Sequence, residues 1–323
     1  MPLDDARPRA IAGNRLTAHT GSIYPILQAP MTWIARAPLV SAVSAAGGFG
    51  LLENSSRDLT ITKREFAAIK AATNQPFGVN LPVRFLKVDE SEESAIIDWL
   101  LEAGIHFVTT SAGDPTRYAR RLKDAGVIVY HAVPTLKGAL KAIDAGCDGL
   151  IVEGYESAGI RGEDEVHSMV LLQAVREKID APIVAAGGIV DGRGLAAAFA
   201  LGADGVAMGT RFVSSRESPV HQNYKDAIVA AGPSGTILTP RPPRAFGRSL
   251  RTQHTEELMA TGSDRGPIGN VIDSLYVGGD VVNSSGAAGE SAGLIHEVKA
   301  VADIVEDTMR GFWREIDRLA ALR

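Results

Sequence analysis

The sequence contains almost no cysteine: Cys147 is the single one in 323 residues, so no disulfide can form within the chain. This composition fits a reducing compartment. The stretch Met1–Pro8 lacks the apolar segment of a secretory signal. No apolar run reaches the roughly 18 residues that cross a bilayer. We therefore expect a cytoplasmic protein with no membrane partner.

Aromatic residues and positive charge are also scarce. Aromatic residues make up 6% of the chain, which argues against an aromatic stacking platform. The 33 basic and 38 acidic residues give a net charge of −5, whereas nucleic-acid-binding proteins usually carry a strong positive charge. Hydrophobic residues (45%) and charged residues (22%) have average frequencies, which excludes a disordered chain, a collagen or a coiled coil. We expect a folded protein with a small-molecule substrate and no nucleic-acid partner.

Short apolar runs recur at a regular interval along the chain. They alternate little between apolar and polar residues, which is typical of strands buried on both faces of a parallel sheet. The pattern predicts strands at Ile26–Ala29, Phe49–Leu52, Phe77–Leu81, Phe107–Thr110, Val127–His131, Gly149–Glu153, Ile183–Ala186 and Gly205–Met208.

Amphipathic helical segments separate these runs. Several of the segments end in a glycine just before the next strand, as at Gly47, Gly104 and Gly126. Glycine at that position adopts the left-handed conformation at no steric cost. A last amphipathic stretch, Gly293–Leu322, predicts a long closing helix. The fold class is therefore α/β, and the expected architecture is a (β/α)8 TIM barrel.

The pattern breaks after the eighth predicted strand. Residues 212–275 are polar and rich in proline, and Gln222–Ala231 and Gln253–Ala260 fit short helices within them. We interpret 212–275 as a small, mainly helical lid or substrate domain inserted after strand 8. Residues 1–211 and 276–323 would then form the barrel.

The last two predicted strands both end in glycine turns. One is followed by Gly187 and Gly188, and the other by Gly209 and Thr210. Phosphate often binds at this place in TIM barrels, because glycine lets backbone N–H groups approach the anion. Each motif alone could be an ordinary turn. The two in succession predict a phosphate site.

The ends of the first and third predicted strands indicate contacts to a flat ring. The first strand runs into Ala29, Pro30 and Met31, and the fixed backbone of the proline suits a wall that faces a ring. Asn80 ends the third strand, and its amide can both donate to and accept from the edge of a heterocycle. The alternatives are a plain turn and an asparagine that caps a loop.

Six motifs follow one another along the chain: Ala29-Pro-Met31, Ser41-Ala-Val-Ser-Ala-Ala-Gly-Gly-Phe-Gly50, Pro76-Phe-Gly-Val-Asn80, Glu153-Gly-Tyr-Glu-Ser-Ala-Gly159, Ala185-Ala-Gly-Gly-Ile189 and Gly205-Val-Ala-Met-Gly-Thr-Arg211. In these motifs and in their order, the sequence resembles the nitronate monooxygenase family, formerly called 2-nitropropane dioxygenases. The family also includes flavin-dependent enoyl-acyl-carrier-protein reductases and NADH:quinone reductases. The resemblance covers nearly the whole chain.

The resemblance implies an FMN-containing barrel with a small second domain over the flavin. The residues that it places beside the isoalloxazine are Ala29, Pro30, Met31 and Asn80. Those that it places at the FMN phosphate are Gly187, Gly188, Gly209 and Thr210.

One position departs from the family pattern. The family usually reads Gly-x-Glu-Ala-Gly-Gly-His-x-Gly after strand six, and here Ile160 stands at the position of the active-site histidine. Isoleucine can neither accept a proton nor form a hydrogen bond, so a step that needs a base there is in doubt. A nitronate is already an anion, and its oxidation is not excluded.

Three nearby residues are candidates for polar chemistry in place of that histidine: His167, Tyr155 and His131. His167 lies seven positions further on and is the predicted catalytic base, with a solvated histidine as the alternative. Tyr155 and Ile160 are predicted to contact substrate. His131 ends the fifth strand, where a structural role is equally consistent. The remaining histidines show no metal-type spacing, and we predict no metal site.

Four arginines form a local basic patch in the inserted segment: Arg241, Arg244, Arg248 and Arg251. They could grip the phosphates of NAD(P)H or the pantetheine arm of a coenzyme A (CoA) or acyl-carrier-protein thioester, and Arg248 is the predicted substrate contact. A solvated loop is the alternative. No Gly-x-Gly-x-x-Gly motif follows a strand, so a Rossmann site for the nicotinamide is not indicated.

Three functions are consistent with this sequence. The first is a nitronate monooxygenase-like flavoenzyme reoxidised by O2, and the second is an NAD(P)H-dependent reductase of an enoyl thioester or quinone. The third is an FMN-binding protein with little catalysis, which Ile160 makes conceivable. The sequence predicts the cofactor better than the substrate, because the flavin carries the redox step. It leaves an oligomeric state open.

Overall fold

The computed structural model describes residues 7–55, 58–83, 90–161, 164–241, 245–263 and 268–322. In this part of the chain, eight parallel strands form one sheet in the order β1-β9-β8-β6-β5-β4-β3-β2. The strands are β1 (Ile26–Gln28), β2 (Gly50–Glu53), β3 (Phe77–Pro82), β4 (Phe107–Ser111), β5 (Ile128–Val133), β6 (Gly149–Glu153), β8 (Ile183–Ala186) and β9 (Gly205–Met208).

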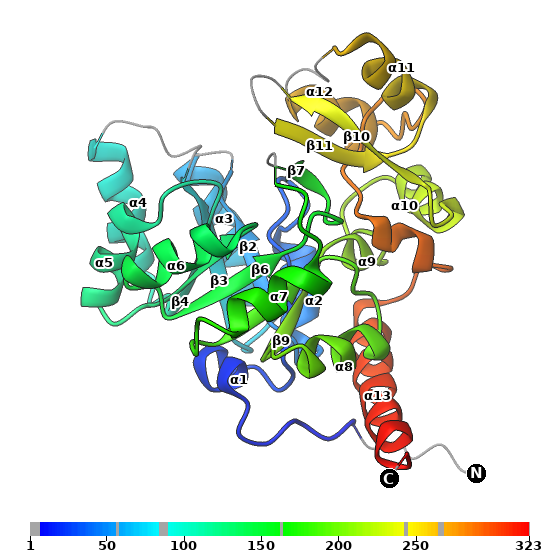
Figure 1. Ribbon diagram of the computed structural model, residues 1–323. Helices are drawn as coiled ribbons and strands as arrows, with labels where there is room; N and C mark the ends of the chain where they lie inside the picture. Colours follow the sequence, from blue (N-terminus) through cyan, green and yellow to red (C-terminus); the bar gives the residue numbers. More distant parts are fainter. Residues whose placement is uncertain are drawn as a thin grey trace.

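A parallel bridge between Leu27 and Phe49 joins the two ends of this sheet. The sheet is therefore closed into the predicted TIM barrel, and each predicted strand corresponds to an observed one within a residue or two. The outer helices are α2 (Ala37–Ala45), α3 (Leu59–Ala72), α4 (Glu90–Glu102), α5 (Thr116–Asp124), α6 (Leu136–Asp144), α7 (Ser168–Arg176), α8 (Gly192–Ala200) and α13 (Val301–Ala320). They surround the strands, as Figure 1 shows.

The closing helix α13 is shorter than the predicted Gly293–Leu322. A 3₁₀ turn covers Glu290–Leu294, and the chain is extended at Ile295 and again at Ala300 before α13 begins. The first N–H of the helix, that of Val301, donates a hydrogen bond of 2.9 Å to the Glu217 carboxylate. A contact distant in sequence thus sets the start of this helix. It packs on α8, where a Cβ on Gly192 would lie 2.1 Å from the Phe312 nitrogen.

The segment after β9 contains the two predicted short helices, α10 (Gln222–Ala230) and α11 (Gln253–Thr261). It also contains a β-hairpin that we did not predict, so the description as mainly helical is incomplete. Its remaining elements are α9 (Thr210–Val213), β10 (Thr236–Arg241), β11 (Ala245–Leu250), α12 (Ile268–Val271) and a π-helix (Ile272–Val277).

The hairpin is attached to the barrel through a third strand, β7 (Gly159–Arg161), which follows β6. It pairs antiparallel with β11, so Ile160 lies opposite Gly247. In Figure 1 the hairpin, α11 and α12 stand beyond one end of the barrel, and the helix Arg15–Thr20 lies at the other end. The predicted domain boundaries at residues 211 and 275 stay a prediction, because this small sheet joins both parts.

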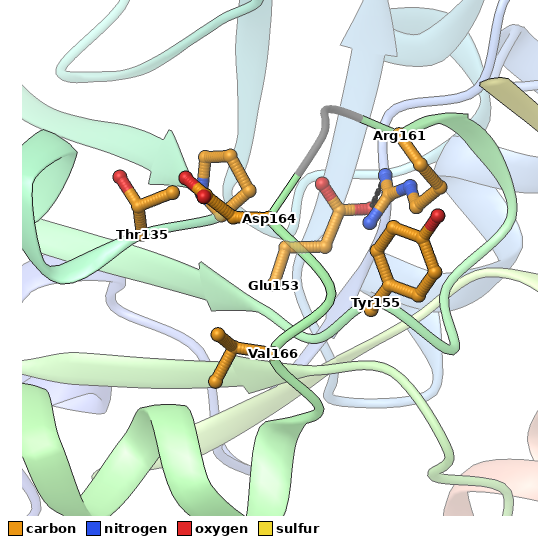
Figure 2. A pocket seen from close by; sticks show the side chains of 7 residues that line it. Thr135, Glu153, Tyr155, Arg161, Asp164 and Val166 are labelled. Atoms are coloured by element: carbon orange, nitrogen blue, oxygen red, sulfur yellow. Dashed lines mark hydrogen bonds and ion pairs between the residues drawn. The ribbon is translucent and has the colours of Figure 1, made fainter. Parts of the chain in front are cut away.

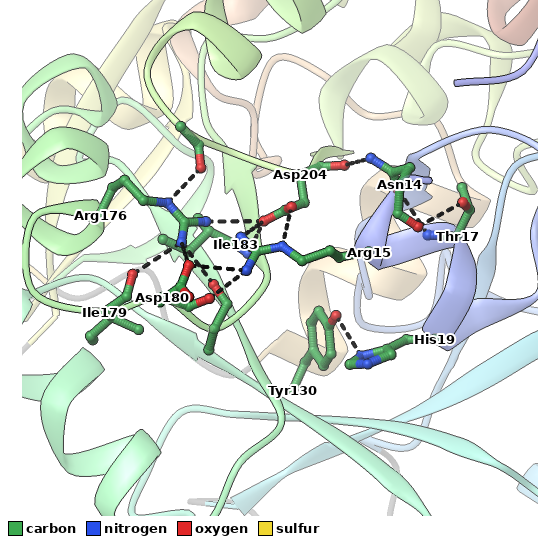
Figure 3. Close-up of polar contacts among 12 residues, drawn as sticks. Asn14, Arg15, Thr17, His19, Tyr130, Arg176, Ile179, Asp180, Ile183 and Asp204 are labelled. Carbon is green, nitrogen blue, oxygen red and sulfur yellow. Dashed lines mark hydrogen bonds and ion pairs between the residues drawn. The ribbon is translucent and has the colours of Figure 1, made fainter. Parts of the chain in front are cut away.

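At the opposite end of the barrel, one carboxylate fastens several elements (Figure 3). Asp204, just before β9, accepts bonds from Arg15 Nε at 2.7 Å and from Arg176 Nη2 at 3.0 Å. It also accepts the backbone N–H of Ile183, the first residue of β8, at 2.9 Å. The same aspartate therefore links α1 (Arg15–Thr20), α7 and two strands. No described helix is both long and apolar enough to cross a membrane.

We expect Asp204→Asn to lower the free energy of unfolding by about 2 kcal/mol, because two guanidinium groups lose their shared charge partner in a largely buried place. Asp180→Asn is the matched control: Asp180 contacts the same two arginines with a fully exposed side chain. Its effect should be much smaller. Urea unfolding of both variants measures this, and equal effects would contradict the assignment.

Candidate active site

The interior of the barrel changes from large to small side chains toward its C-terminal end. The inner cluster contains bulky residues such as Leu51, Phe107, Tyr130 and Ile151. The last inward positions of four strand ends are alanines instead: Ala29, Ala132, Ala186 and Ala207. Alanine side chains at this level leave a low apolar floor under the mouth of the barrel. Such a floor can accept the face of a flat ring.

Polar side chains stand around this floor. Asn80, at the end of β3, is 5% exposed, and its Oδ1 accepts a bond from Thr109 Oγ1 at 2.9 Å. The bond fixes the orientation of the Asn80 amide at the rim. Asn80 therefore lies where the sequence predicts a contact to the edge of a heterocycle.

The predicted phosphate-binding residues lie at the ends of two neighbouring strands, β8 and β9. Gly187 has a φ of +106°, and a Cβ there would lie 2.7 Å from Ser157 Oγ, so a side chain fits neither the backbone nor the space. Thr210 Oγ1 accepts the Gly289 N–H at 3.0 Å. A Cβ on Gly209 would lie 3.7 Å from Ala29 Cβ and 3.7 Å from Met31 Sδ. The structure thus brings the predicted ring and phosphate residues together.

Glu156 organises the loop that follows β6. Its carboxylate accepts the Ser168 N–H at 3.2 Å and the Ser168 hydroxyl, at the start of α7. A negative charge at a helix N-terminus is favourable. A Cβ on Gly154 would lie 2.2 Å from this carboxylate, which explains the glycine. Glu156 is therefore engaged in holding the loop.

The loop continues into β7, where the residue in place of the family histidine is part of a strand. Ile160 is half-buried and paired with Gly247. The next residue, Arg161, is 5% exposed, and its Nη2 lies 2.6 Å from Glu153 Oε1 at the end of β6. Its Nη1 donates to the Gly154 carbonyl at 3.0 Å. The arginine thus ties β7 back to the barrel strand.

Tyr155 is 6% exposed and held on several sides. Its N–H donates to the Val166 carbonyl at 3.0 Å, and its carbonyl accepts from Arg248 Nε at 3.3 Å. The His167 ring meets its ring edge-on at a centroid distance of 5.9 Å. Its hydroxyl is buried and has the Glu165 side chain as a hydrogen-bonding neighbour. Burial, followed by the nearby Glu165 carboxylate, raises the pKa of this phenol.

The two candidate histidines lie in different surroundings. His167 is exposed and is the N-cap residue of α7, without a capping bond from its ring. His131 is 4% exposed, and its Nδ1 lies 2.7 Å from Thr110 Oγ1. Its neighbours Val129 and Val133 face the outer core, so His131 lies between sheet and helices rather than in the mouth. Burial lowers its pKa to about 4, and its role is structural.

The predicted basic patch is only partly described. Arg248 is 6% exposed, and besides Tyr155 it contacts Glu290 Oε1 at 3.0 Å and Thr236 Oγ1 at 3.3 Å. Arg251 binds Glu256 Oε1 at 3.2 Å and the Ser234 carbonyl at 3.0 Å. The structure therefore gives both arginines protein partners. Arg244 and the side chain of Arg241 lie outside the described residues.

A small cavity of about 30 Å³ lies beside β6 at the mouth (Figure 2). Its lining residues are Pro134, Thr135, Glu153, Tyr155, Arg161, Asp164 and Val166. Glu153 and Arg161 were not predicted as site residues, because their pairing depends on the course of β7. Trp33, also unpredicted, has a φ of +65° just after the Ala29–Met31 turn and stacks on Tyr276 at 5.9 Å. Its strained backbone becomes visible only in the structure.

Known proteins share the sequence pattern and the fold of this chain. A family model described as nitronate monooxygenase matches residues 14–310. The chain belongs to the nitronate monooxygenase family. The resemblance inferred from the motifs is thereby confirmed, and the protein is an oxidoreductase of this family.

Three relatives illustrate the range of the family. The (3aS,4S,5R,7aS)-5-hydroxy-7a-methyl-1-oxo-octahydro-1H-indene-4-carboxyl-CoA dehydrogenase of Mycobacterium tuberculosis is 35% identical over 254 residues, or 78% of this chain and 70% of that protein. The nitronate monooxygenase of Paraburkholderia phytofirmans is 26% identical over 351 residues, covering 91% and 94%. The structure of FabK from Thermotoga maritima superposes with a TM-score of 0.88 at 35% identity, covering 97% and 100%.

Proposed function

We propose that the protein is an FMN-dependent oxidoreductase that acts on an acyl thioester, with NAD(P)H as its electron partner. The arrangement of residues at the mouth of the barrel supports FMN as the cofactor. There a floor of alanines and the buried Asn80 adjoin two glycine turns at the ends of β8 and β9. When bound, FMN would supply hydride transfer to or from the substrate.

The residues of the mouth fit the parts of FMN by their chemistry. The apolar floor around Ala29 suits the face of the isoalloxazine, and the Asn80 amide suits its polar edge. The turns at Gly187–Gly188 and Gly209–Thr210 offer backbone N–H groups to a phosphate without a side chain at Gly187 in the way. These residues would hold and orient the cofactor.

The choice of an acyl thioester depends on the relatives, because the loss of a base at Ile160 counts equally against abstracting a proton from a neutral nitroalkane and from an acyl chain. The M. tuberculosis relative is named for a carboxyl-CoA substrate, and its 35% identity exceeds the 26% of the P. phytofirmans nitronate monooxygenase. Oxidation of a nitronate is the second candidate, because this anion needs no base and the family model carries that name.

The cofactor site predicts that Ala29→Leu weakens FMN binding at least about tenfold, because the longer side chain fills the space above the floor. FMN affinity is measured from the quenching of flavin fluorescence in a titration of the apoprotein. Ala103→Leu is the control, since Ala103 is also partly buried but packs on the outer core. Equal affinity of Ala29→Leu and the wild-type protein would contradict the placement.

The reaction is tested by anaerobic mixing of the FMN-loaded protein with NADH, NADPH and propyl nitronate in turn. We expect a nicotinamide to bleach the flavin absorbance and a following addition of crotonyl-CoA to restore it. Bleaching by the nitronate alone would assign the protein to the second candidate. Failure of crotonyl-CoA to restore the absorbance would count against thioester reduction.

His167 is the proposed general acid or base, on the loop that carries Tyr155. His167→Ala should lower turnover at least about tenfold and leave the bound FMN unchanged. His106→Ala is the matched control, because His106 is exposed and lies just before β4, at the opposite end of the strand from the mouth. Steady-state rates and flavin content of both variants are compared. Unchanged turnover in His167→Ala would reject the role.

A further inference from the structure

A groove of about 600 Å³ lies between the segment that precedes α1 and the helix α13. Most of its lining is polar, and the residues that matter here are Arg7, Arg9, Trp313, Arg314 and Asp317. Figure 1 shows α13 extending from the inserted segment toward the end of the barrel at which α1 lies. The groove shares no residue with the mouth of the barrel, and the proposed function does not account for it.

Three contacts fix the segment that forms one side of this groove. Trp313 Nε1 donates to the Arg9 carbonyl at 2.9 Å, and the Arg9 guanidinium lies 3.7 Å from the centre of the Trp313 ring. A cation over an aromatic face is attracted to it. The Tyr24 hydroxyl donates to the Pro8 carbonyl at 2.8 Å. The arginines of the segment and those of α13 are therefore held on the same groove.

The charges in the groove are not balanced. On α13, Arg310 Nε binds Glu306 Oε1 at 2.7 Å. By contrast, Arg7, Arg9 and Arg314 form no ion pair with any carboxylate in the described part of the chain. Three unpaired guanidinium groups on one groove repel one another, in a chain whose net charge is −5. A ligand with several negative charges would remove this repulsion.

The chemistry of the lining selects the kind of anion. Guanidinium groups bind phosphate oxygens through paired hydrogen bonds. The groove is much larger than a single phosphate needs and falls within the roughly 300–1,000 Å³ of sites for small organic ligands. Asp307, also on the lining, is paired with Lys299 Nζ at 2.7 Å, whereas Asp317 forms no ion pair with a described residue. A carboxylate only accepts hydrogen bonds, so Asp317 suits the hydroxyls of a sugar and disfavours a bare anion.

We propose that this groove binds a nucleoside diphosphate. Arg7, Arg9 and Arg314 would hold the diphosphate, and Asp317 would accept hydrogen bonds from the ribose hydroxyls. The bound ligand would link the segment before α1 to α13. This site does not depend on the proposed function, because none of its residues belongs to the proposed FMN site.

The test is calorimetric titration of the purified protein with ADP and, separately, with inorganic pyrophosphate. We expect ADP to bind more tightly than pyrophosphate. Arg314→Gln should weaken ADP binding about five- to tenfold, because a charged donor to the diphosphate is lost. Arg318→Gln is the matched control: it removes the same charge from an exposed position of α13 that lies outside the groove and is paired with Glu315 at 2.7 Å. It should change the affinity less than about twofold.

Asp317→Ala distinguishes the nucleoside from the bare anion. It should weaken ADP binding about threefold, because the ribose loses its acceptor, and strengthen pyrophosphate binding, because a repelling charge is removed. Absence of ADP binding would overturn the proposal, and so would ADP that binds no more tightly than pyrophosphate. Equal weakening by Arg314→Gln and Arg318→Gln would show general charge attraction instead of a site. ADP binding that Arg314→Gln leaves unchanged would place the nucleotide elsewhere and also overturn the proposal.

Discussion

The pairing of β7 with β11 is the constraint on which the site depends. Three residues, Gly159–Arg161, leave the loop after β6 and join the hairpin of the inserted segment. Arg161 ties this strand back to Glu153, and Arg248 on β11 reaches the Tyr155 carbonyl and Glu290. The loop and the hairpin are therefore fixed together at the mouth of the barrel. A cofactor on the alanine floor would therefore lie in a site whose wall is formed by the pairing of β7 with β11.

The pairing of β7 with β11 also affects the chemistry that the site can perform. It places Ile160, an apolar strand residue, where the family pattern has a histidine. Proton transfer then has to depend on other groups, and the loop offers His167.

Local patterns in the sequence predicted the barrel, and they also predicted that the residues proposed to bind the ring and the phosphate stand at strand ends. Ile183–Ala186, for example, is an apolar run that tertiary contacts did not alter. The hairpin escaped prediction because its strands are polar and include Pro240, whose position is acceptable only outside the centre of a sheet. From the sequence, Arg248 is predicted to contact substrate, with a solvated loop as the alternative. Its burial results from partners 12, 42 and 93 positions away in the sequence, which no local pattern reveals.

The most direct test of this account is a crystal structure of the protein with FMN and butyryl-CoA. The account predicts the isoalloxazine over Ala29, Ala132 and Ala186, its phosphate at the turns after β8 and β9, and butyryl-CoA at the mouth of the barrel beside the flavin. A flavin bound elsewhere in the fold would contradict it. So would butyryl-CoA bound away from the mouth of the barrel.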